Sequence, residues 1–259
     1  MNDSYYERDG NRYRPTDLTI GPWSPDAQHA GPPSALLAGS LEAAAPSHMQ
    51  LVRLTVELYG PIPMTPLEVE TIVTRPGGRI TMTEASLSAD GRPCARALGV
   101  HHRVGDVSVP AGRPSGSIQL PGPSPSPLPS PVPGTAQTWF GQSLEARYEP
   151  PHSGPGAGPR VVWLRTNADI VAGEPTSPFQ WVVPLADCGN GISWLSQTDV
   201  IFPNSDLTVY LHRVPVDRWV RLDATSTWQS TGTGLAESDL SDRRGPIGRS
   251  AQSLFLESL

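Results

Sequence analysis

The chain has 259 residues, 25 Asp and Glu against 19 Lys and Arg, a net charge of −6, and 37% hydrophobic residues. This apolar content suffices for a folded core and excludes global disorder, which needs few apolar residues and a high net charge. A pI near 5.5 argues against nucleic acid or an anionic membrane as the main partner. All the basic residues are arginines, which excludes a Schiff-base lysine or a Walker-type lysine.

Cysteine content and the N-terminus indicate the cellular environment. Cys94 and Cys188 are too few for a disulfide framework, so we expect reduced core thiols. Residues 1–8 lack the apolar segment of a signal peptide. No run approaches the roughly 18 apolar residues that cross a bilayer. These features predict a soluble, cytoplasmic protein without a membrane partner.

Proline divides the chain into two regions. Residues 110–134 hold 9 prolines in 25 positions. Such a segment can neither pair in a sheet nor continue a helix, so we expect an extended, semi-rigid linker. A proline-rich ligand for a partner module is the alternative. The linker separates two regions of similar size, residues 1–109 and 135–259.

Each region shows the same order of signals. In the first, Pro32 and Pro33 precede an alanine- and leucine-rich segment that Pro46 ends, which predicts a helix over 34–45. In the second, a helix is expected over 178–187, although Pro184 interrupts it. Apolar alternation between Pro and Gly turns then predicts strands in both regions. These strands cover 51–60, 67–77, 79–91 and 92–104 in the first region and 206–216, 217–230, 234–242 and 246–257 in the second.

A constant offset of 153 residues relates the two regions. It aligns the sequence LTVEL, which begins at Leu54, with LTVYL, which begins at Leu207. The same offset aligns Arg96 with Arg249. One offset across separated motifs indicates duplication of a helix-plus-antiparallel-sheet unit. Chance similarity between two β-rich halves is the alternative.

A long helix wrapped by an antiparallel sheet, present twice in one chain, resembles the double hotdog fold of the type II acyl-CoA thioesterases. The resemblance covers nearly the whole chain apart from the linker and implies an α+β double hotdog fold. It rests on an ordered set of motifs: Gln28-His29-Ala30-Gly31-Pro32-Pro33, Leu185-Ala186-Asp187 with Gly189-Asn190-Gly191, Asp206-Leu207-Thr208 leading to His212-Arg213, and Ser250-Ala251-Gln252-Ser253.

The resemblance also implies catalytic residues. The family pattern uses an Asp, a Ser or Thr, and a Gln of the C-terminal repeat to orient a hydrolytic water, and these roles fall on Asp206, Thr227 and Gln252. A carboxylate base can suffice for an electrophilic thioester, and the other two residues would fix the water's position. Asp206 could instead be a strand-start residue that binds the backbone. The position of Thr227 could be off by two residues.

The loop before the first helix is the expected substrate-binding contribution of the other repeat. Gly31 would let the backbone approach the thioester closely, and the N-terminal end of the helix offers N–H groups to a carbonyl oxygen. His29 either contacts the substrate or packs the loop.

Only the C-terminal repeat carries the acid and the amide. At the offset of 153, Asp206 corresponds to Arg53 and Gln252 to Gly99, whereas Thr227 corresponds to Thr74. One half with these residues and one half without them is typical of a duplicated enzyme that has kept a single active site. Sequence drift in two non-catalytic repeats would give the same pattern.

Hydrolysis of an acyl-CoA or related acyl thioester by Asp-activated water, without cofactor or metal, is the leading hypothesis. His101 and His102 adjoin on a strand and face opposite ways, so they cannot share a metal. The alternatives are a hotdog enoyl-thioester hydratase or dehydratase, which pairs Asp with a nearby His, and a non-catalytic acyl-thioester-binding protein. The thioester could be carried by an acyl-carrier protein instead of CoA. Arg165 and Arg213 are candidates for contacts with the phosphates of the carrier. Exposed edge strands would allow a homo-oligomer.

Overall fold

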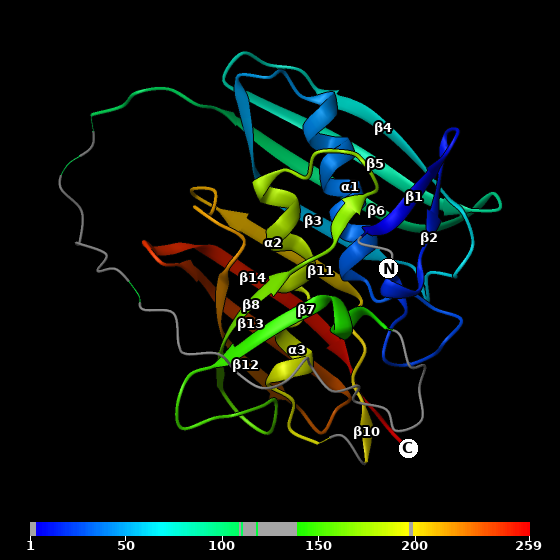
Figure 1. Ribbon diagram of the computed structural model, residues 1–259, viewed down its shortest axis with the longest axis vertical. Helices are drawn as coiled ribbons and strands as arrows, with labels where there is room; N and C mark the ends of the chain where they lie inside the picture. Colours follow the sequence, from blue (N-terminus) through cyan, green and yellow to red (C-terminus); the bar gives the residue numbers. More distant parts are fainter. Residues whose placement is uncertain (1–3, 109, 111–117, 119–138, 197–198) are drawn as a thin grey trace.

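One large, mostly antiparallel sheet dominates the computed structural model, which describes residues 4–108, 110, 118, 139–196 and 199–259. Thirteen strands follow one another in the order β7-β8-β12-β13-β14-β11-β3-β6-β5-β4-β2-β1-β9 (Figure 1). The helices pack on one face of this sheet. Within the described ranges, no helix is long and apolar enough to cross a membrane.

The N-terminal half of the sheet packs against helix α1 (Gly31–Ala44). This helix begins three residues before the predicted start, because Pro32 and Pro33 occupy its first turn, where a missing N–H breaks no helical hydrogen bond. It ends before Pro46, as predicted. The other elements of this half are β1 (Ser4–Asp9), β2 (Arg12–Pro15), the 3₁₀ turn η1 (Asp17–Thr19), β3 (Met49–Leu58), β4 (Leu67–Arg75), β5 (Ile80–Ala89) and β6 (Arg92–Arg103).

In its described residues, the C-terminal half has two shorter helices, α2 (Pro178–Ala186) and α3 (Gly189–Ile192). Helix α2 starts with a capping box, in which Ser177 Oγ accepts from the Gln180 N–H at 3.1 Å and Gln180 Oε1 accepts from the Ser177 N–H at 3.0 Å. It continues through Pro184, the residue that made the helix uncertain in the sequence, and ends at Ala186. The remaining elements are η2 (Phe140–Ser143), β7 (Leu144–Tyr148), β8 (Arg160–Thr166), β9 (Asp169–Val171), β10 (Val200–Ile201), β11 (Asp206–Leu211), β12 (Val220–Trp228), β13 (Thr233–Asp242), β14 (Gly245–Phe255) and β15 (Glu257–Ser258).

The two halves share one strand order and meet edge to edge. The order is β1-β2-β4-β5-β6-β3 in the first half and β7-β8-β12-β13-β14-β11 in the second. Strands β3 and β11 pair antiparallel, from Glu57 opposite Asp206 to Arg53 opposite Tyr210. Strand β9, from the C-terminal half, adds in parallel to β1 at the far edge. This arrangement confirms the predicted α+β double hotdog fold.

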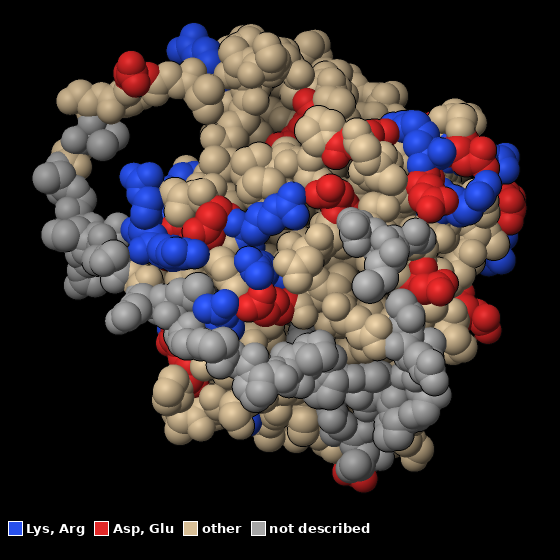
Figure 2. Space-filling view, in the orientation of Figure 1, with Lys and Arg blue, Asp and Glu red and all other residues tan. Residues whose placement is uncertain are grey.

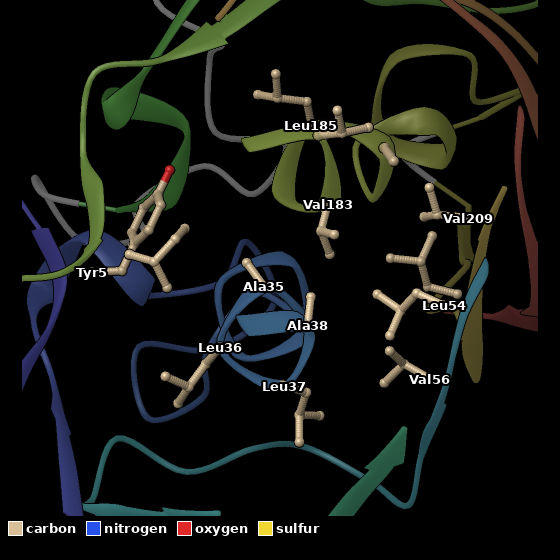
Figure 3. Packing of buried hydrophobic residues seen from close by; sticks show 14 of the residues in the cluster. Tyr5, Ala35, Leu36, Leu37, Ala38, Leu54, Val56, Val183, Leu185 and Val209 are labelled. Carbon is tan, nitrogen blue, oxygen red and sulfur yellow. The ribbon is translucent and has the colours of Figure 1, made fainter. Parts of the chain in front are cut away.

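The core lies between the helices and the inner face of the sheet (Figure 3). Leu37 and Ala38 of α1 and Val183 of α2 are fully buried, as are Leu54 of β3 and Val209 of β11. Close packing at the joint between the halves therefore buries apolar side chains from both repeats together. At about 25 cal/mol per Å² of buried apolar surface, such packing is the main stabilising contribution.

Basic and acidic side chains lie side by side on the surface (Figure 2). Arg165, a candidate for phosphate contact, pairs with Glu145. Arg213, another candidate, makes a bidentate contact with the buried Asp242. Of residues 110–134, the structure describes Pro110 and Ile118 alone, so the predicted linker otherwise lies outside the described residues.

Candidate active site

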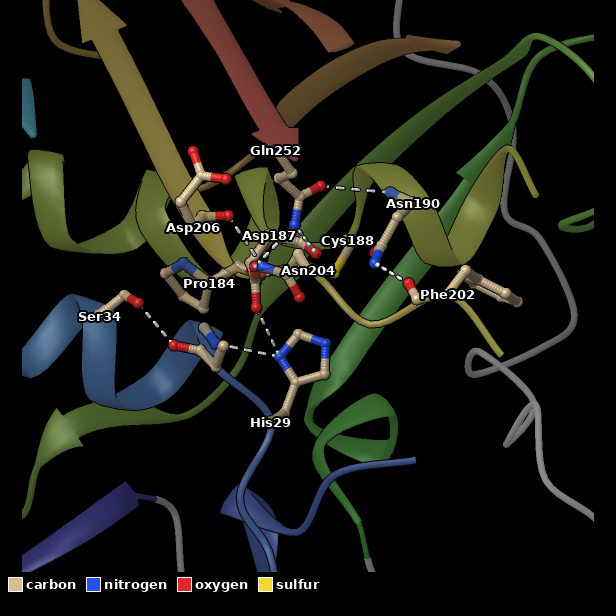
Figure 4. Close-up of polar contacts among 12 residues, drawn as sticks. His29, Ser34, Pro184, Asp187, Cys188, Asn190, Phe202, Asn204, Asp206 and Gln252 are labelled. Atoms are coloured by element: carbon tan, nitrogen blue, oxygen red, sulfur yellow. Dashed lines mark hydrogen bonds and ion pairs between the residues drawn. The ribbon is translucent and has the colours of Figure 1, made fainter. Parts of the chain in front are cut away.

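A buried carboxylate at the end of α2 forms the centre of a polar cluster (Figure 4). Asp187 is 2% exposed. Its Oδ1 accepts hydrogen bonds from Gln252 Nε2 at 2.8 Å and from Asn204 Nδ2 at 3.0 Å, and its Oδ2 lies 3.1 Å from His29 Nδ1. The C-terminal end of a helix disfavours negative charge, so these N–H donors compensate an unfavourable position.

Gln252 joins the sheet to this carboxylate. It lies on the inner face of β14, is 2% exposed, and donates a second hydrogen bond from Nε2 to the Asp187 carbonyl at 3.2 Å. Its Oε1 accepts from the Asn190 N–H at 3.3 Å. Both ends of the amide therefore have partners, which fixes its orientation toward Asp187.

The N-terminal repeat contributes His29, so the cluster spans both halves. The imidazole stacks on Phe140, with ring centroids 4.1 Å apart. Its Nδ1 faces two partners, Asp187 Oδ2 and the Gly31 N–H, the latter also at 3.1 Å. With a proton on Nδ1, the ring donates to Asp187; without it, Nδ1 accepts from Gly31 and Nε2 carries the proton.

Gly31 has a packing role in this structure. A β-carbon at this position would lie 2.9 Å from the Pro184 Cα, so only glycine permits this approach of α1 to α2. The close backbone contact expected for Gly31 is thus made to helix α2. His29, two residues earlier, is the member of this loop that reaches the carboxylate.

Asp206 and Gln252 lie close together but point to opposite faces of the sheet. Leu207 and Val209 are buried on the inner face of β11, so the period of two turns Asp206 to the outer face. Its Oδ1 accepts from the Ser253 N–H at 2.8 Å, the strand-start role that was the alternative in the sequence. The expectation that Asp206 acts with Gln252 in catalysis stays a prediction, and in this structure Gln252 binds Asp187 instead.

Thr227 is likewise on the other face. Along β12, Ala224 and Ser226 are buried and Thr227 is exposed. The inward hydroxyl is that of Ser226, 2.9 Å from Ser193 Oγ. Thr227 and Ser226 are one residue apart and therefore face opposite sides of the strand. Neither hydroxyl contacts Asp187.

Sequence reasoning overlooked Asp187 and Asn204 as functional residues. Asp187 stood in a recognised motif at the end of the second helix, and an acid at a helix C-terminus was the available signal. Asn204 lies 17 residues from Asp187 and Gln252 lies 65 residues from it. Only the folded chain brings such distant residues together.

Among residues 4–108, the N-terminal repeat has no corresponding cluster in the sheet. The pairing of β5 with β6 sets Gly99 opposite Thr83, as that of β13 with β14 sets Gln252 opposite Ala236. A β-carbon at Gly99 would lie 2.6 Å from Thr83 Oγ1 and 3.0 Å from His101 Nε2, and these two atoms are hydrogen-bonded at 2.8 Å. The pair fills the space that a side chain at Gly99 would take.

His101 itself is a neutral, buried group. Desolvation by burial lowers the pKa of His101 to about 4. His102 is exposed on the opposite face, as the sequence predicts. In the part of the chain that the structure describes, no three His, Cys, Asp or Glu residues are grouped as a metal site would require.

Two repeats with one strand order define a double hotdog protein; they are joined through β3 and β11 and share a cluster of His, Asn and Gln side chains around a buried Asp. The chain matches the N-terminal domain of acyl-CoA thioesterases over residues 19–102 and their C-terminal domain over residues 121–256. It therefore belongs to the acyl-CoA thioesterase family, whose members hydrolyse acyl-CoA thioesters. No curated protein sequence matches the chain.

Solved structures share the fold over nearly the whole chain. A protein of Novosphingobium aromaticivorans, described as a thioesterase, is 18% identical, with a TM-score of 0.71 and 98% of each chain covered. The acyl-CoA thioesterase II TesB2 of Mycobacterium marinum is 16% identical, with a TM-score of 0.64 and coverage of 98% of this chain and 94% of that one. A hot dog fold protein of Alicyclobacillus acidocaldarius is 15% identical, with a TM-score of 0.69 and coverage of 99% and 97%.

Proposed function

We propose that this acyl-CoA thioesterase hydrolyses its substrate with a water that Asp187 activates. The observation that carries the proposal is the arrangement of the Asp187 carboxylate, which is buried between the two repeats. Two amide N–H groups hold its Oδ1, and its Oδ2 faces the loop of the other repeat. A carboxylate fixed in this way has one oxygen left to accept a proton.

Asp187 alone can act first as the base and then as the acid in this hydrolysis. Asp187 Oδ2 takes a proton from water while the water oxygen attacks the thioester carbonyl carbon. The carbon–sulfur bond then breaks, and the proton on Asp187 passes to the thiolate of CoA. The products are a carboxylic acid and free CoA, and Asp187 is ionised again. The carbonyl of a thioester is electrophilic enough that no covalent acyl-enzyme is needed.

Gln252 and Asn204 act as positioning residues in this scheme. Each donates a hydrogen bond to Oδ1 and so fixes the plane of the carboxylate, which directs Oδ2. Holding a base within a fraction of an ångström of its productive place accounts for a large share of many rate enhancements. His29 donates a hydrogen bond to Oδ2 in the tautomer that carries the proton on Nδ1, which adds a third contact to the carboxylate.

The test compares two isosteric variants. Asp187→Asn keeps shape but cannot take the proton, so thiol release from acyl-CoA should fall by about 10²–10⁴. Asp206→Asn, on the outer face of the same half, is the matched control and should keep near-normal turnover. Melting temperatures of both proteins show whether they are folded. A folded Asp187→Asn protein with normal turnover, or loss only in Asp206→Asn, would contradict the proposal.

One observation bears on the hydratase alternative. An enoyl-thioester hydratase pairs an Asp with a His, and His29 Nδ1 lies 3.1 Å from Asp187 Oδ2. The same preparation should therefore be incubated with a 2-enoyl-CoA and followed by loss of the enoyl absorbance and by thiol release. Hydrolysis predicts thiol release without a hydroxyacyl product. Accumulation of hydroxyacyl-CoA would favour the hydratase.

A further inference from the structure

Three aromatic side chains from separate segments meet where the two repeats adjoin. Trp23 belongs to the loop before α1, Phe202 to the segment before β11, and Trp228 to the end of β12. The centroid of the Phe202 ring lies 5.1 Å from that of the Trp23 ring, in an edge-on contact, and 5.2 Å from that of the Trp228 ring. We call Trp23, Phe202 and Trp228 the aromatic cluster.

This cluster lies one row along the sheet from Gln252, the residue that binds the Asp187 carboxylate. The Phe202 carbonyl accepts from Asn190 Nδ2 at 3.5 Å, and Figure 4 shows Phe202 next to Asn190, whose N–H binds Gln252. Cross-strand pairing gives the inner-face row Trp228–Gly234–Leu254–Asn204. Gln252 stands in the next row, with Ala236 and Ser226, about 7 Å along the strands. The cluster and Asp187 thus share one end of the sheet.

Helix α3 lies directly on the inner face of the sheet. A β-carbon at Gly189 would lie 2.9 Å from Ser238 Oγ and 3.2 Å from Gln252 Oε1. Farther along, Ser193 Oγ and Ser226 Oγ are hydrogen-bonded at 2.9 Å. Small side chains in direct contact leave no path for a chain of many methylene groups between α3 and the sheet.

The space between helices α1 and α2 is also closed to an acyl chain. Gly31 approaches the backbone of Pro184 so closely that a β-carbon would lie 2.9 Å from the Pro184 Cα. Helices α1 and α2 are therefore in contact beside His29. When the thioester carbonyl lies next to Asp187, these two closed routes direct the acyl group toward the aromatic cluster.

The cluster has free capacity for a ligand. Trp23 is 43% exposed although its ring is in a T-shaped contact with Phe202. The buried Trp228 Nε1 has no hydrogen-bond partner among the described residues. An aromatic ring placed against these side chains would gain edge-to-face or offset-stacked contacts, and a polar group near Trp228 would satisfy its N–H.

We propose that the aromatic cluster receives the acyl group and that the enzyme prefers ring-bearing acyl groups, such as arylacyl thioesters, over long straight chains. This inference rests on the proposed function, because it takes the thioester carbonyl to lie at Asp187. Trp23 is the specificity-determining residue easiest to change, since its partial exposure makes a substitution tolerable for folding.

The experiment measures kcat/KM for phenylacetyl-CoA, acetyl-CoA and palmitoyl-CoA. For the natural chain, phenylacetyl-CoA should exceed palmitoyl-CoA by roughly tenfold or more, the value of one well-placed aromatic contact. Trp23→Leu should remove most of this preference and leave acetyl-CoA within about twofold. Tyr210→Leu, which removes an exposed aromatic side chain from the outer face of β11, is the matched control and should change nothing.

Binding to Asp187→Asn, measured by calorimetry, separates the two proposals. If no thioester is hydrolysed, the proposed function fails, and the order of affinities still decides the inference. Tighter binding of phenylacetyl-CoA than of palmitoyl-CoA, reduced by Trp23→Leu, supports the aromatic cluster. Equal or stronger binding and turnover of palmitoyl-CoA, or a uniform loss for all three thioesters in Trp23→Leu, overturns it.

Discussion

Thr55 and Thr208 face each other across the joint of β3 and β11, with their hydroxyl oxygens 3.2 Å apart. The two residues are separated by 153 positions, the offset that relates the repeats in the sequence. On either side of them, Leu54 pairs with Val209 and Val56 pairs with Leu207. Because Leu54 corresponds to Leu207 and Val56 to Val209, a half-turn about the threonine pair places each of these two pairs on the other. The threonine pair therefore marks the pseudo-two-fold axis of the duplicated fold.

This geometry predicts a cross-link. Directly opposite residues of an antiparallel pair have Cα atoms about 4.5–5.5 Å apart, within the range of roughly 4.4–6.8 Å that a disulfide spans. A protein with Thr55→Cys and Thr208→Cys should form an intramolecular disulfide on mild oxidation. Thiol titration in denaturant and mobility on non-reducing gels measure it.

A second pair with the same offset is the control for this cross-link. Arg53 and Asp206 are also 153 positions apart, but Asp206 pairs with Glu57, so Arg53 lies about 13 Å away along β3. Arg53→Cys with Asp206→Cys should not cross-link within one chain. Equal cross-linking in both proteins would mean that β3 and β11 are not joined in this register.

The strands of the sheet were predictable because their pattern is local. In β14, the inward Gln252 and Leu254 alternate with the outward Ser253 and Phe255, and such alternation can be read from the sequence. Strands β1 and β8 were missed, and each has consecutive buried residues, such as Tyr5 and Tyr6 in β1. A strand buried on both faces does not alternate, so period-two patterning fails to find it.

Gln252 and Asn204 should behave as one unit with Asp187. Because both donate to the same carboxylate oxygen, Gln252→Ala or Asn204→Ala alone should lower kcat by about 10- to 100-fold through misplacement of the base. Combined with Asp187→Asn, either change should add little, since the carboxylate that it positions is already disabled. Single-turnover rates of the double variants measure this. Fully multiplicative losses would show that the two amides act elsewhere.

His29 is expected to act through Asp187 while its ring packs on Phe140. His29→Phe keeps the aromatic stack and removes Nδ1, so we expect kcat to fall by roughly 10-fold or more with little change in melting temperature. Phe140→Leu, which removes the stack and keeps the imidazole, is the matched variant and should lower stability more than kcat. Unchanged turnover in a folded His29→Phe protein would limit His29 to packing the loop.

The register of the active site could not be fixed from the sequence, for a physical reason. Thr225, Ser226 and Thr227 are three consecutive hydroxyl residues, so composition alone does not show which of them faces inward. Asp206 and Asp187 are both acids next to a recognised motif, and only burial distinguishes them. That burial results from α2, α3 and the His29 loop converging on one point of the sheet.

Glu42 should make the contact between the two repeats sensitive to pH. Its Oε2 accepts a hydrogen bond from Ser177 Oγ at 2.5 Å, where the cap of α2 meets α1. Burial raises the pKa of Glu42 above its usual value, and the hydrogen bond from Ser177 offsets part of this effect. The folded protein therefore holds this proton more tightly than the unfolded chain does. Stability is lost as the pH rises from the usual glutamate pKa through the raised one.

Glu42→Gln removes the titration and keeps an oxygen for Ser177 to donate to. The free energy of unfolding of Glu42→Gln relative to the natural chain should rise with pH across that interval, by about 1.4 kcal/mol for each unit by which the pKa is raised. Urea unfolding at a series of pH values measures this difference. Glu84→Gln is the control of opposite sign, because the ion pair with Arg96 lowers the pKa of Glu84. The stability of Glu84→Gln relative to the natural chain should fall as the pH rises from the lowered pKa to the usual one. If the relative stabilities of the two variants changed with pH in the same direction, the assignment of Glu42 would be wrong.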